Sequence, residues 1–207
     1  MTSARQIYLG SRRGPALPYD AEVEYIESTG TQWIDTGYTS NHRDEVVSAI
    51  INNHKDITAA QAIFASFGSG TSVRMQLYKT TGRIGGNYVS FQVPGNKVTS
   101  VVADIPNLRF VIDGQVYSSS GMSAPAMEVP LTVFYRNPSI GVFRLYGFTI
   151  TRSSKLVMDL TPVRFTNEQG VSDGAMYDRV SGQLFRNAGT GVFGFGTDIA
   201  GGGGING

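Results

Sequence analysis

The fold of this chain is decided by a stretch near its N-terminus, Glu24-Tyr-Ile-Glu-Ser-Thr-Gly-Thr-Gln-Trp-Ile-Asp-Thr-Gly-Tyr38. A second stretch lies near the other end and reads Gly174-Ala-Met-Tyr-Asp-Arg-Val-Ser-Gly-Gln-Leu-Phe-Arg-Asn-Ala-Gly-Thr-Gly191. Both predict short strands separated by tight turns. Neither contains a set of residues suited to catalysis. We therefore expect strands near both ends of one β domain.

Between these stretches the sequence predicts strands nearly throughout. The pair Asp113-Gly114 is a strong hairpin signal, because both central positions of a type I′ turn need positive φ. The segment 142–150 is apolar on both faces, which predicts a central strand covered on both sides. Period-2 alternation is clearest in Val73, Met75 and Leu77, in Val89, Phe91 and Val93, in Leu108, Phe110 and Ile112, and in Leu131, Val133 and Tyr135.

Helix signals are poor by comparison. The best stretch, residues 56–64, is short and could equally be a loop that enters a strand over residues 62–67. With many short strands and frequent turns, the natural architecture is a sandwich of two antiparallel sheets.

Composition fits a single β domain of this kind. The 207 residues are 41% hydrophobic and include 11 Phe, 10 Tyr and 1 Trp, which is enough for a sizeable core. No apolar run is long enough for a membrane-spanning helix, and the first ten residues lack the apolar stretch of a secretory signal. Cysteine is absent, which weakly favours assembly in a reducing cytosol. The formal net charge of +1 gives no reason to expect a nucleic-acid partner.

We divide the chain into three parts. Residues 1–19 are an N-terminal arm or linker, because their charge, glycine and proline do not suit a core strand. Residues 20–195 are the β domain, and residues 196–207 are a glycine-rich tail that we expect to be flexible. The arm is either a frayed terminus or an assembly element that docks on a neighbouring subunit. The residues expected to make its contacts are Ile7, Tyr8, Leu9, Arg12 and Arg13.

These stretches resemble the concanavalin A-like, or laminin-G-like, jelly-roll domains of bacteriophage structural proteins and gut-bacterial surface proteins. The opening strand of those domains often reads close to residues 24–37, with Tyr where Trp33 stands here. The resemblance continues in segments 110–114, 144–150, 156–163, 176–178 and 184–191, and covers about residues 22–195. It implies an all-β fold, a two-sheet antiparallel jelly-roll sandwich. Since the family includes adhesins, lectin-like modules and virion decorations, it leaves the role open.

Catalysis is not expected, although related sandwiches include glycoside hydrolases. Asp20, Glu22 and Glu24 alternate as paired carboxylates would. The resemblance, however, puts them at the edge of the first strand. Charges at such an edge discourage strand-to-strand aggregation, and this is the better explanation.

No metal or other cofactor is expected either. His42 and His54 have no neighbouring carboxylate at ligand spacing and cysteine is missing, so no structural zinc site is expected. Many laminin-G-like domains hold one Ca²⁺, but the sequence does not support one here. Its possible ligands, Asp35, Asp104 and Asp173, are better explained as turn-forming or capping residues.

Carbohydrate binding would need an exposed aromatic platform with polar groups beside it. Tyr78 and Tyr88 are the best candidates, since their alternation places them opposite the apolar face, and Arg74 is a possible polar partner. Trp33 alternates with Ile34 and could face either way. The alternative is that most aromatic residues fill the core, because strands favour them in any case. The wider set is Tyr38, Tyr117, Tyr135, Arg136 and Asn137.

Two functions follow as expectations. The first is a non-enzymatic bacteriophage virion protein, a capsid decoration, head fibre or tail component assembled in the host cytoplasm. Its partners are other virion proteins or copies of itself, with host-surface glycans bound weakly by many copies. The second is a carbohydrate-binding or adhesin module that is secreted or held at a bacterial surface. A degenerate glycoside hydrolase comes third, and none of these involves nucleic acid or membrane insertion.

Overall fold

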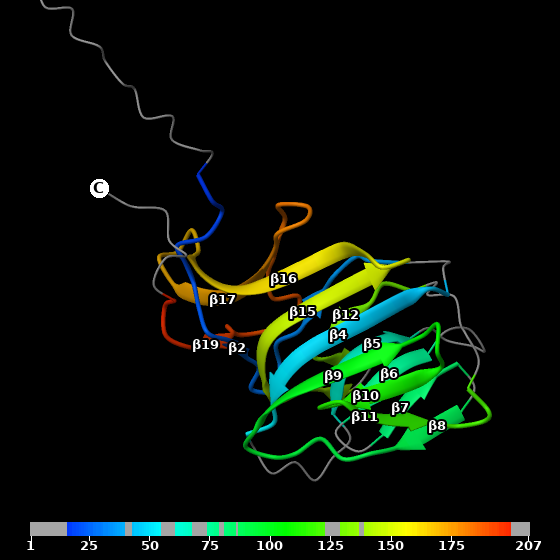
Figure 1. The fold of residues 1–207 in the computed structure, drawn as a ribbon. Coiled ribbons are helices and arrows are strands. Elements are labelled where there is room, and N and C mark those ends of the chain that lie inside the picture. The colour runs from blue at the N-terminus through cyan, green and yellow to red at the C-terminus, as the bar shows by residue number, and fades with distance from the viewer. Residues whose placement is uncertain are drawn as a thin grey trace, which may run out of the picture.

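The computed structural model describes residues 16–39, 43–54, 61–67, 74–78, 81–85, 87–122, 129–136 and 139–199. Of residues 67, 74–78, 87 and 136 it describes the backbone alone. Throughout this part the chain is all-β, and every pairing between its strands is antiparallel. Two sheets lie face to face (Figure 1), which confirms the predicted all-β sandwich architecture. The described residues form no helix that is long and apolar enough to cross a membrane.

The larger sheet has eleven strands. Its main path runs β11-β10-β9-β4-β15-β16-β17-β18, while β1 joins at β16 and β2 joins at β15 and β19. The bounds are β1 Ala21–Glu22, β2 Ile26–Glu27, β4 Glu45–Asn52, β9 Val98–Asp104, β10 Arg109–Ile112, β11 Gln115–Ser118, β15 Arg144–Arg152, β16 Lys155–Thr166, β17 Ser172–Asp178, β18 Leu184–Phe185 and β19 Gly194–Phe195.

The smaller sheet has six strands in the order β3-β12-β5-β6-β7-β8, and β13 and β14 form a separate pair. The bounds are β3 Ile34–Asp35, β5 Ala62–Phe67, β6 Arg74–Tyr78, β7 Thr81–Ile84, β8 Asn87–Ser90, β12 Thr132–Val133, β13 Tyr135–Arg136 and β14 Ser139–Ile140.

The core lies between the two sheets. The ring of Phe64 on β5 meets the ring of Phe148 on β15 edge to face, with centroids 5.9 Å apart. Phe91, just after β8, packs against Phe110 on β10 at 5.6 Å. A Cβ on Gly82 of β7 would lie 2.4 Å from the Phe110 ring, so only glycine allows the sheets to approach this closely there. Each buried phenylalanine contributes about 1.5–3 kcal/mol of hydrophobic stabilisation.

Several predicted strands and one turn are confirmed. The strand predicted over 62–67 is β5. The Asp113-Gly114 hairpin joins β10 to β11, and both turn residues have positive φ, 47° and 84°. The strand predicted through residues 131–135 is instead interrupted at Phe134, whose φ is 69° and whose ring stacks on Phe143 at 4.3 Å. Phe134 lies in the chain between β12 and β13, and its ring is buried. This packing holds a backbone conformation that period-2 alternation cannot reveal.

β15 is the central strand that the sequence predicts. It pairs with β4 on one side and with β16 and β2 on the other. Leu145, Phe148 and Ile150 are buried between the sheets, whereas Arg144 and Tyr146 on the opposite face are only half-buried. One face of β15 is therefore buried and the other is half-buried, so the prediction that both faces are covered is confirmed only in part.

The opening segment, residues 20–28, lies inside the larger sheet. On one side β1 pairs with β16, and β2 pairs with β15. On the other side residues 194–199 run antiparallel to it, through β19 and the bridge between Val23 and Asp198. The prediction that Asp20, Glu22 and Glu24 line a sheet edge is wrong, because the last described residues of the chain cover that edge.

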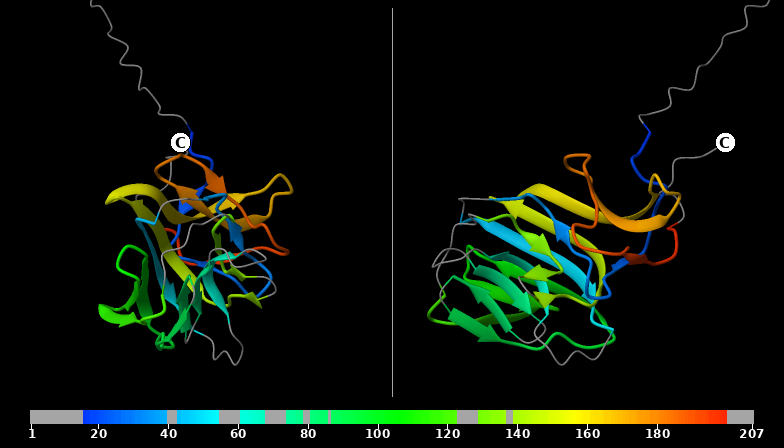
Figure 2. Two further views of the ribbon diagram at one scale, coloured as in Figure 1. Left: turned by 90° about the vertical axis from the view of Figure 1, so that its right-hand side faces the viewer. Right: turned by 180° about the vertical axis from the view of Figure 1, so that it is seen from behind.

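Both ends of the described chain lie at the same end of the sandwich (Figure 2). Pairing begins at Asp20, whose backbone N donates to Arg164 O at 2.8 Å, and ends at Ile199, whose N donates to Glu22 O at 2.8 Å. An ion-pair group, the end clasp, joins them: Arg164 lies 2.8 Å from Asp198 and 3.5 Å from Asp20. The predicted arm residues Ile7, Tyr8, Leu9, Arg12 and Arg13, and the glycine run at 201–204, lie outside the described residues.

Candidate functional site

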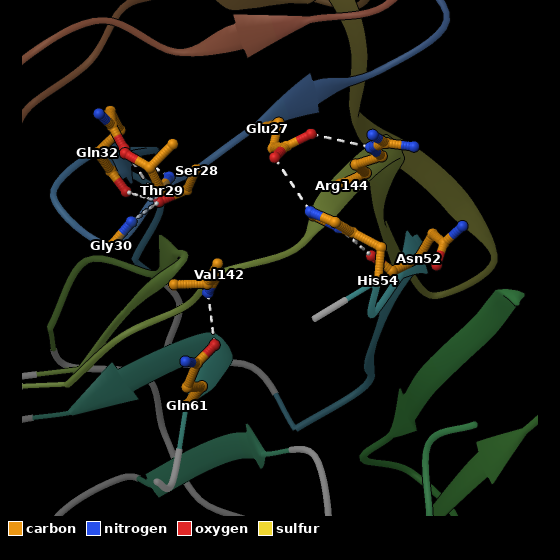
Figure 3. Close-up of polar contacts among 10 residues, drawn as sticks. All are labelled: Glu27, Ser28, Thr29, Gly30, Gln32, Asn52, His54, Gln61, Val142 and Arg144. Atoms are coloured by element: carbon orange, nitrogen blue, oxygen red, sulfur yellow. Dashed lines mark hydrogen bonds and ion pairs between the residues drawn. The ribbon is translucent and has the colours of Figure 1, made fainter. Parts of the chain in front are cut away.

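The turn inside the opening stretch is organised around one buried amide. Oε1 of Gln32 accepts hydrogen bonds from the backbone N of Thr29 at 2.8 Å and from Oγ of Ser28 at 3.3 Å (Figure 3). It also accepts one from the backbone N of Thr31 at 3.4 Å. Gln32 and Ser28 are almost fully buried. Gly30 has a φ of 110°, which L side chains rarely adopt. The contacts of the Gln32 amide and the positive φ of Gly30 therefore hold this segment in a tight turn.

The closing stretch docks on that turn. Oδ1 of Asn187 accepts a hydrogen bond from the backbone N of Trp33 at 3.2 Å, and Thr190 N donates to Thr31 O at 3.0 Å. A Cβ on Gly189 would lie 2.0 Å from Thr31 O, so a glycine is required at this contact. We call residues 28–33 together with 187–191 the seam. The opening stretch, residues 24–38, and the closing stretch, residues 174–191, contact each other at the seam.

A second polar group lies on the outer face of the larger sheet. The Glu27 carboxylate lies between Arg144 and His54. Its Oε2 is 2.9 Å from Arg144 Nε and its Oε1 is 3.0 Å from His54 Nε2 (Figure 3). The register explains the contact, because Arg144 pairs with Glu27 of β2 on one side and with Asn52 of β4 on the other.

Two tyrosines complete this group. The Arg144 guanidinium lies over the Tyr25 ring, 4.5 Å from its centroid, and the rings of Tyr25 and Tyr146 are 5.4 Å apart. A Cβ on Gly196 would lie 2.9 Å from the Tyr25 ring, so the tyrosine rests on bare backbone of the last strand segment. We call Tyr25, Glu27, His54, Arg144 and Tyr146 the outer cluster.

The outer cluster can act as a hydrogen-bonding surface. The hydrogen bond to Glu27 raises the pKa of the Arg144 guanidinium, which therefore stays charged. Its Nε is held by Glu27, and within the described part of the chain no hydrogen bond engages its terminal Nη1 and Nη2, although a third of the side chain is exposed. Beside it, Asn52 Oδ1 is buried and accepts no hydrogen bond. The terminal nitrogens of Arg144 are therefore the donors that this group presents, whereas Asn52 Oδ1 is enclosed by the protein.

The structure does not bring the predicted glycan-binding residues together. Tyr88 on β8 is 52% exposed, and Arg83 covers its ring at 4.9 Å and bonds its hydroxyl at 3.3 Å. Trp33 lies just before β3, at the opposite edge of the smaller sheet, and stacks on Tyr135 at 4.6 Å. Arg74 and Tyr78 bound β6, between these two edges, and their side chains lie outside the described residues.

Two of the three acidic residues considered for catalysis, Asp20 and Glu22, are held in ion pairs and hydrogen bonds, and Glu24 is exposed. Asp20 Oδ2 accepts a hydrogen bond from Thr166 Oγ1 at 2.7 Å, besides its place in the end clasp. Glu22 Oε2 lies 2.8 Å from Arg179 Nη2. These contacts tie β1 to β16 and to the turn that follows β17.

The three aspartates considered for calcium have separate structural contacts. Asp35 Oδ1 accepts a hydrogen bond from Gly37 N at 2.9 Å, which confirms a turn-capping role. Asp104 accepts hydrogen bonds from Asn107 at 2.9 Å and from Arg109 at 2.7 Å. Asp173 accepts one from Phe193 N at 2.8 Å, and burial raises the pKa of its carboxyl. In the residues that the structure describes, no three metal-binding side chains come together.

Sequence reasoning missed the outer cluster, although part of its signal was present. Tyr25 and Glu27 alternate with buried Ile26, and Arg144 and Tyr146 alternate with buried Leu145. Each pair therefore had to share the outer face of its strand. What the sequence did not reveal is that β2 and β15 are neighbours, which makes one group of the two pairs.

We compared the chain with known proteins. No protein-family model, no curated protein and no solved structure matches it.

Proposed function

We propose that this protein is a non-enzymatic structural component of a bacteriophage virion, built as a laminin-G-like jelly roll and displayed on the capsid, a head fibre or the tail. The observation that carries the proposal is the pairing of the two ends of the domain. Residues 20–28 and 194–199 run side by side, and the end clasp joins them.

This geometry suits a displayed module. Attachment through either end holds the domain by one extremity and leaves both sheet faces and the opposite end free. In the jelly-roll family that the sequence resembles, such domains are anchored on larger assemblies. The sequence of residues 1–15, with its apolar and basic residues, supplies a candidate anchor next to this point.

The experiment that tests the proposal is mass spectrometry on purified phage particles, with the copies of this chain counted against the major capsid protein. A fixed copy number per particle is expected. Absence of the chain from particles whose genome encodes it would overturn the proposal.

The role of the arm is tested by removing residues 1–15, a deletion that leaves the contact between Tyr19 and Tyr177, 5.0 Å apart, in place. We expect an unchanged unfolding midpoint and loss of incorporation into particles. Normal incorporation of the shortened chain would show that the arm is not the anchor.

An extracellular carbohydrate-binding or adhesin module is a second candidate function. It is favoured by Tyr88, whose ring is half exposed and held by Arg83 on the outer face of the smaller sheet. Aromatic faces of this kind pack against sugar rings. A glycan array probed with the protein and with Tyr88→Ala tests it, and an equal signal from both would remove the support that Tyr88 gives.

A further inference from the structure

We propose that β11 is the edge at which two copies of this chain associate, by pairing their β11 strands antiparallel across a two-fold axis. The inference goes beyond the proposed function, because it identifies a surface of the domain itself and holds whether or not the protein belongs to a virion. It rests on the backbone, the side chains and the charges at this end of the larger sheet.

The backbone of β11 has one side open for pairing. β11 is the last strand on the path of the larger sheet, and among the described strands it pairs with β10 alone (Figure 1). The two-residue turn at Asp113-Gly114 makes Ile112 and Gln115 a hydrogen-bonded pair, and such pairs alternate along an antiparallel ladder. The N–H and C=O of Val116 therefore point away from β10, and no hydrogen bond within the described residues engages them. An open edge of this kind is a template for another strand.

The side chains on the outer face suit pairing with an identical strand. Val102, Val111 and Val116 form one row across β9, β10 and β11, because each is the Cα partner of the next, and Val116 is 52% exposed. Pairing centred on Val116 would place it beside Val116 of the second copy and continue the row across both sheets. Cross-strand pairs of β-branched residues stabilise a sheet. The same register would place Gly114 opposite Ser118 of the second copy, so only small residues meet at each end.

Charge favours a second copy as the partner. β11 has no charged residue, so self-pairing places no like charges opposite each other. Charged residues beside it in the sheet are compensated: Lys97 Nζ lies 2.7 Å from Asp113 Oδ2, and Arg109 Nε lies 2.7 Å from Asp104 Oδ2. This surface therefore does not repel an identical one, and it gives no preference to a charged partner.

The other strand edges are less suited to self-pairing. β18 and β3, which end the two sheets on the side away from β11, are only two residues long. β8 ends the smaller sheet beside β11 and carries Tyr88, whose ring is covered by the Arg83 guanidinium at 4.9 Å. Self-pairing at β8 would place two such guanidinium groups on adjacent tyrosine rings, a contact between like charges that β11 avoids.

The first test is analytical ultracentrifugation of the unchanged protein and of Val116→Lys. We expect the unchanged protein to be a dimer at about 100 µM and the variant to associate at least about tenfold more weakly, because a lysine on an edge strand opposes pairing. Val180→Lys is the matched control, since Val180 is similarly exposed, at 48%, but lies in the turn after β17. It should associate as the unchanged protein does. A monomeric unchanged protein at this concentration, or equal association of the two variants, would overturn the inference.

A second measurement needs no variant. In the dimer the amide hydrogen of Val116 is bonded to the second copy, so its exchange with deuterated water should slow as the protein concentration rises. The amide of Tyr117, which faces β10 in either state, should change much less. Fast exchange of the Val116 amide in a dimer would mean that the copies meet elsewhere, and the inference would fail. Neither result bears on the virion proposal, which the copy number in purified particles decides.

Discussion

The seam and the outer cluster both include residues of the opening stretch, yet their polar side chains have different partners. In the seam, the buried Gln32 and the half-buried Asn187 bond backbone groups of the turn and of the docked loop. In the outer cluster, Glu27, His54 and Arg144 bond one another at the surface of a sheet. The opening stretch therefore contributes both to the contact that closes the fold and to an ion-paired group on the outer face of the larger sheet.

The difference predicts where mutations act. Backbone partners are fixed by the fold, so the loss of a seam side chain leaves backbone donors without their acceptors, and stability falls. Side-chain partners near the surface can turn towards water when one of them is removed. Changes in the seam should therefore cost more stability than changes in the outer cluster.

The largest effect is expected from Gly189→Ala. Its Cβ would lie 2.0 Å from Thr31 O and 2.8 Å from Trp33 Cδ1, so the closing loop cannot dock without moving backbone. We expect a loss of about 3 kcal/mol in the free energy of unfolding, measured by urea denaturation. Gly95→Ala is the control, because its Cβ would make only an ordinary contact of 3.8 Å with Asn53 O. Equal stability of the two variants would mean that the seam is not closed in solution.

Gln32→Ala should have the next largest effect. It removes the buried oxygen that accepts from Thr29 N, Thr31 N and Ser28 Oγ. A loss of about 2 kcal/mol is expected in the same denaturation experiment. Gln169→Ala, at an exposed turn, should change stability by less than about 0.5 kcal/mol. A Gln32 variant as stable as this control would contradict the assigned role of the amide.

Glu27→Gln compares the two regions directly. Arg144 loses its charged partner but a third of its side chain is exposed, so we expect a loss of less than about 1 kcal/mol in the free energy of unfolding, measured by the same urea denaturation. A loss as large as that of Gln32→Ala would contradict the difference between the seam and the outer cluster.

The smallest effect concerns a carboxylate buried in the closing segment. Burial raises the pKa of Asp173 in the folded state, so its protonated form is favoured there. The stability that this form contributes is complete below the unfolded pKa of about 3.8 and is lost as pH rises through the folded value. Asp173→Asn keeps an oxygen for Phe193 N, and its stability relative to the unchanged protein should therefore increase from pH 3 to pH 6. A constant difference across this range would show that burial does not control the group.

Local signals in the sequence predicted much of the fold. Alternation located β10, and the Asp113-Gly114 pair located its hairpin, because these features depend on residues close together in the chain. The break at Phe134 could not be predicted in this way. The Phe134 ring packs against Phe143 and against Phe193, and Phe193 comes from a segment far along the chain.

The candidate site was less predictable for a similar reason. Tyr88 is exposed, as its alternation suggested, whereas Trp33 is stacked in a place that only the docking of the closing loop defines. The outer cluster depends on β2, β4 and β15 being neighbours in a register that places Glu27 beside Arg144. Strand order of this kind is set by the whole sheet, and no short window of sequence contains it.

The end clasp has a mechanical consequence. Since the chain enters at Asp20 and leaves at Ile199 along antiparallel neighbours, a force that pulls the two ends apart opens their hydrogen bonds one after another, starting at the clasp. A force that pulls on one end against the far tip of the sandwich loads many hydrogen bonds of β16 at once. The domain should therefore unfold at low force when it is pulled between its two termini. It should withstand a higher force when it is attached through one terminus only.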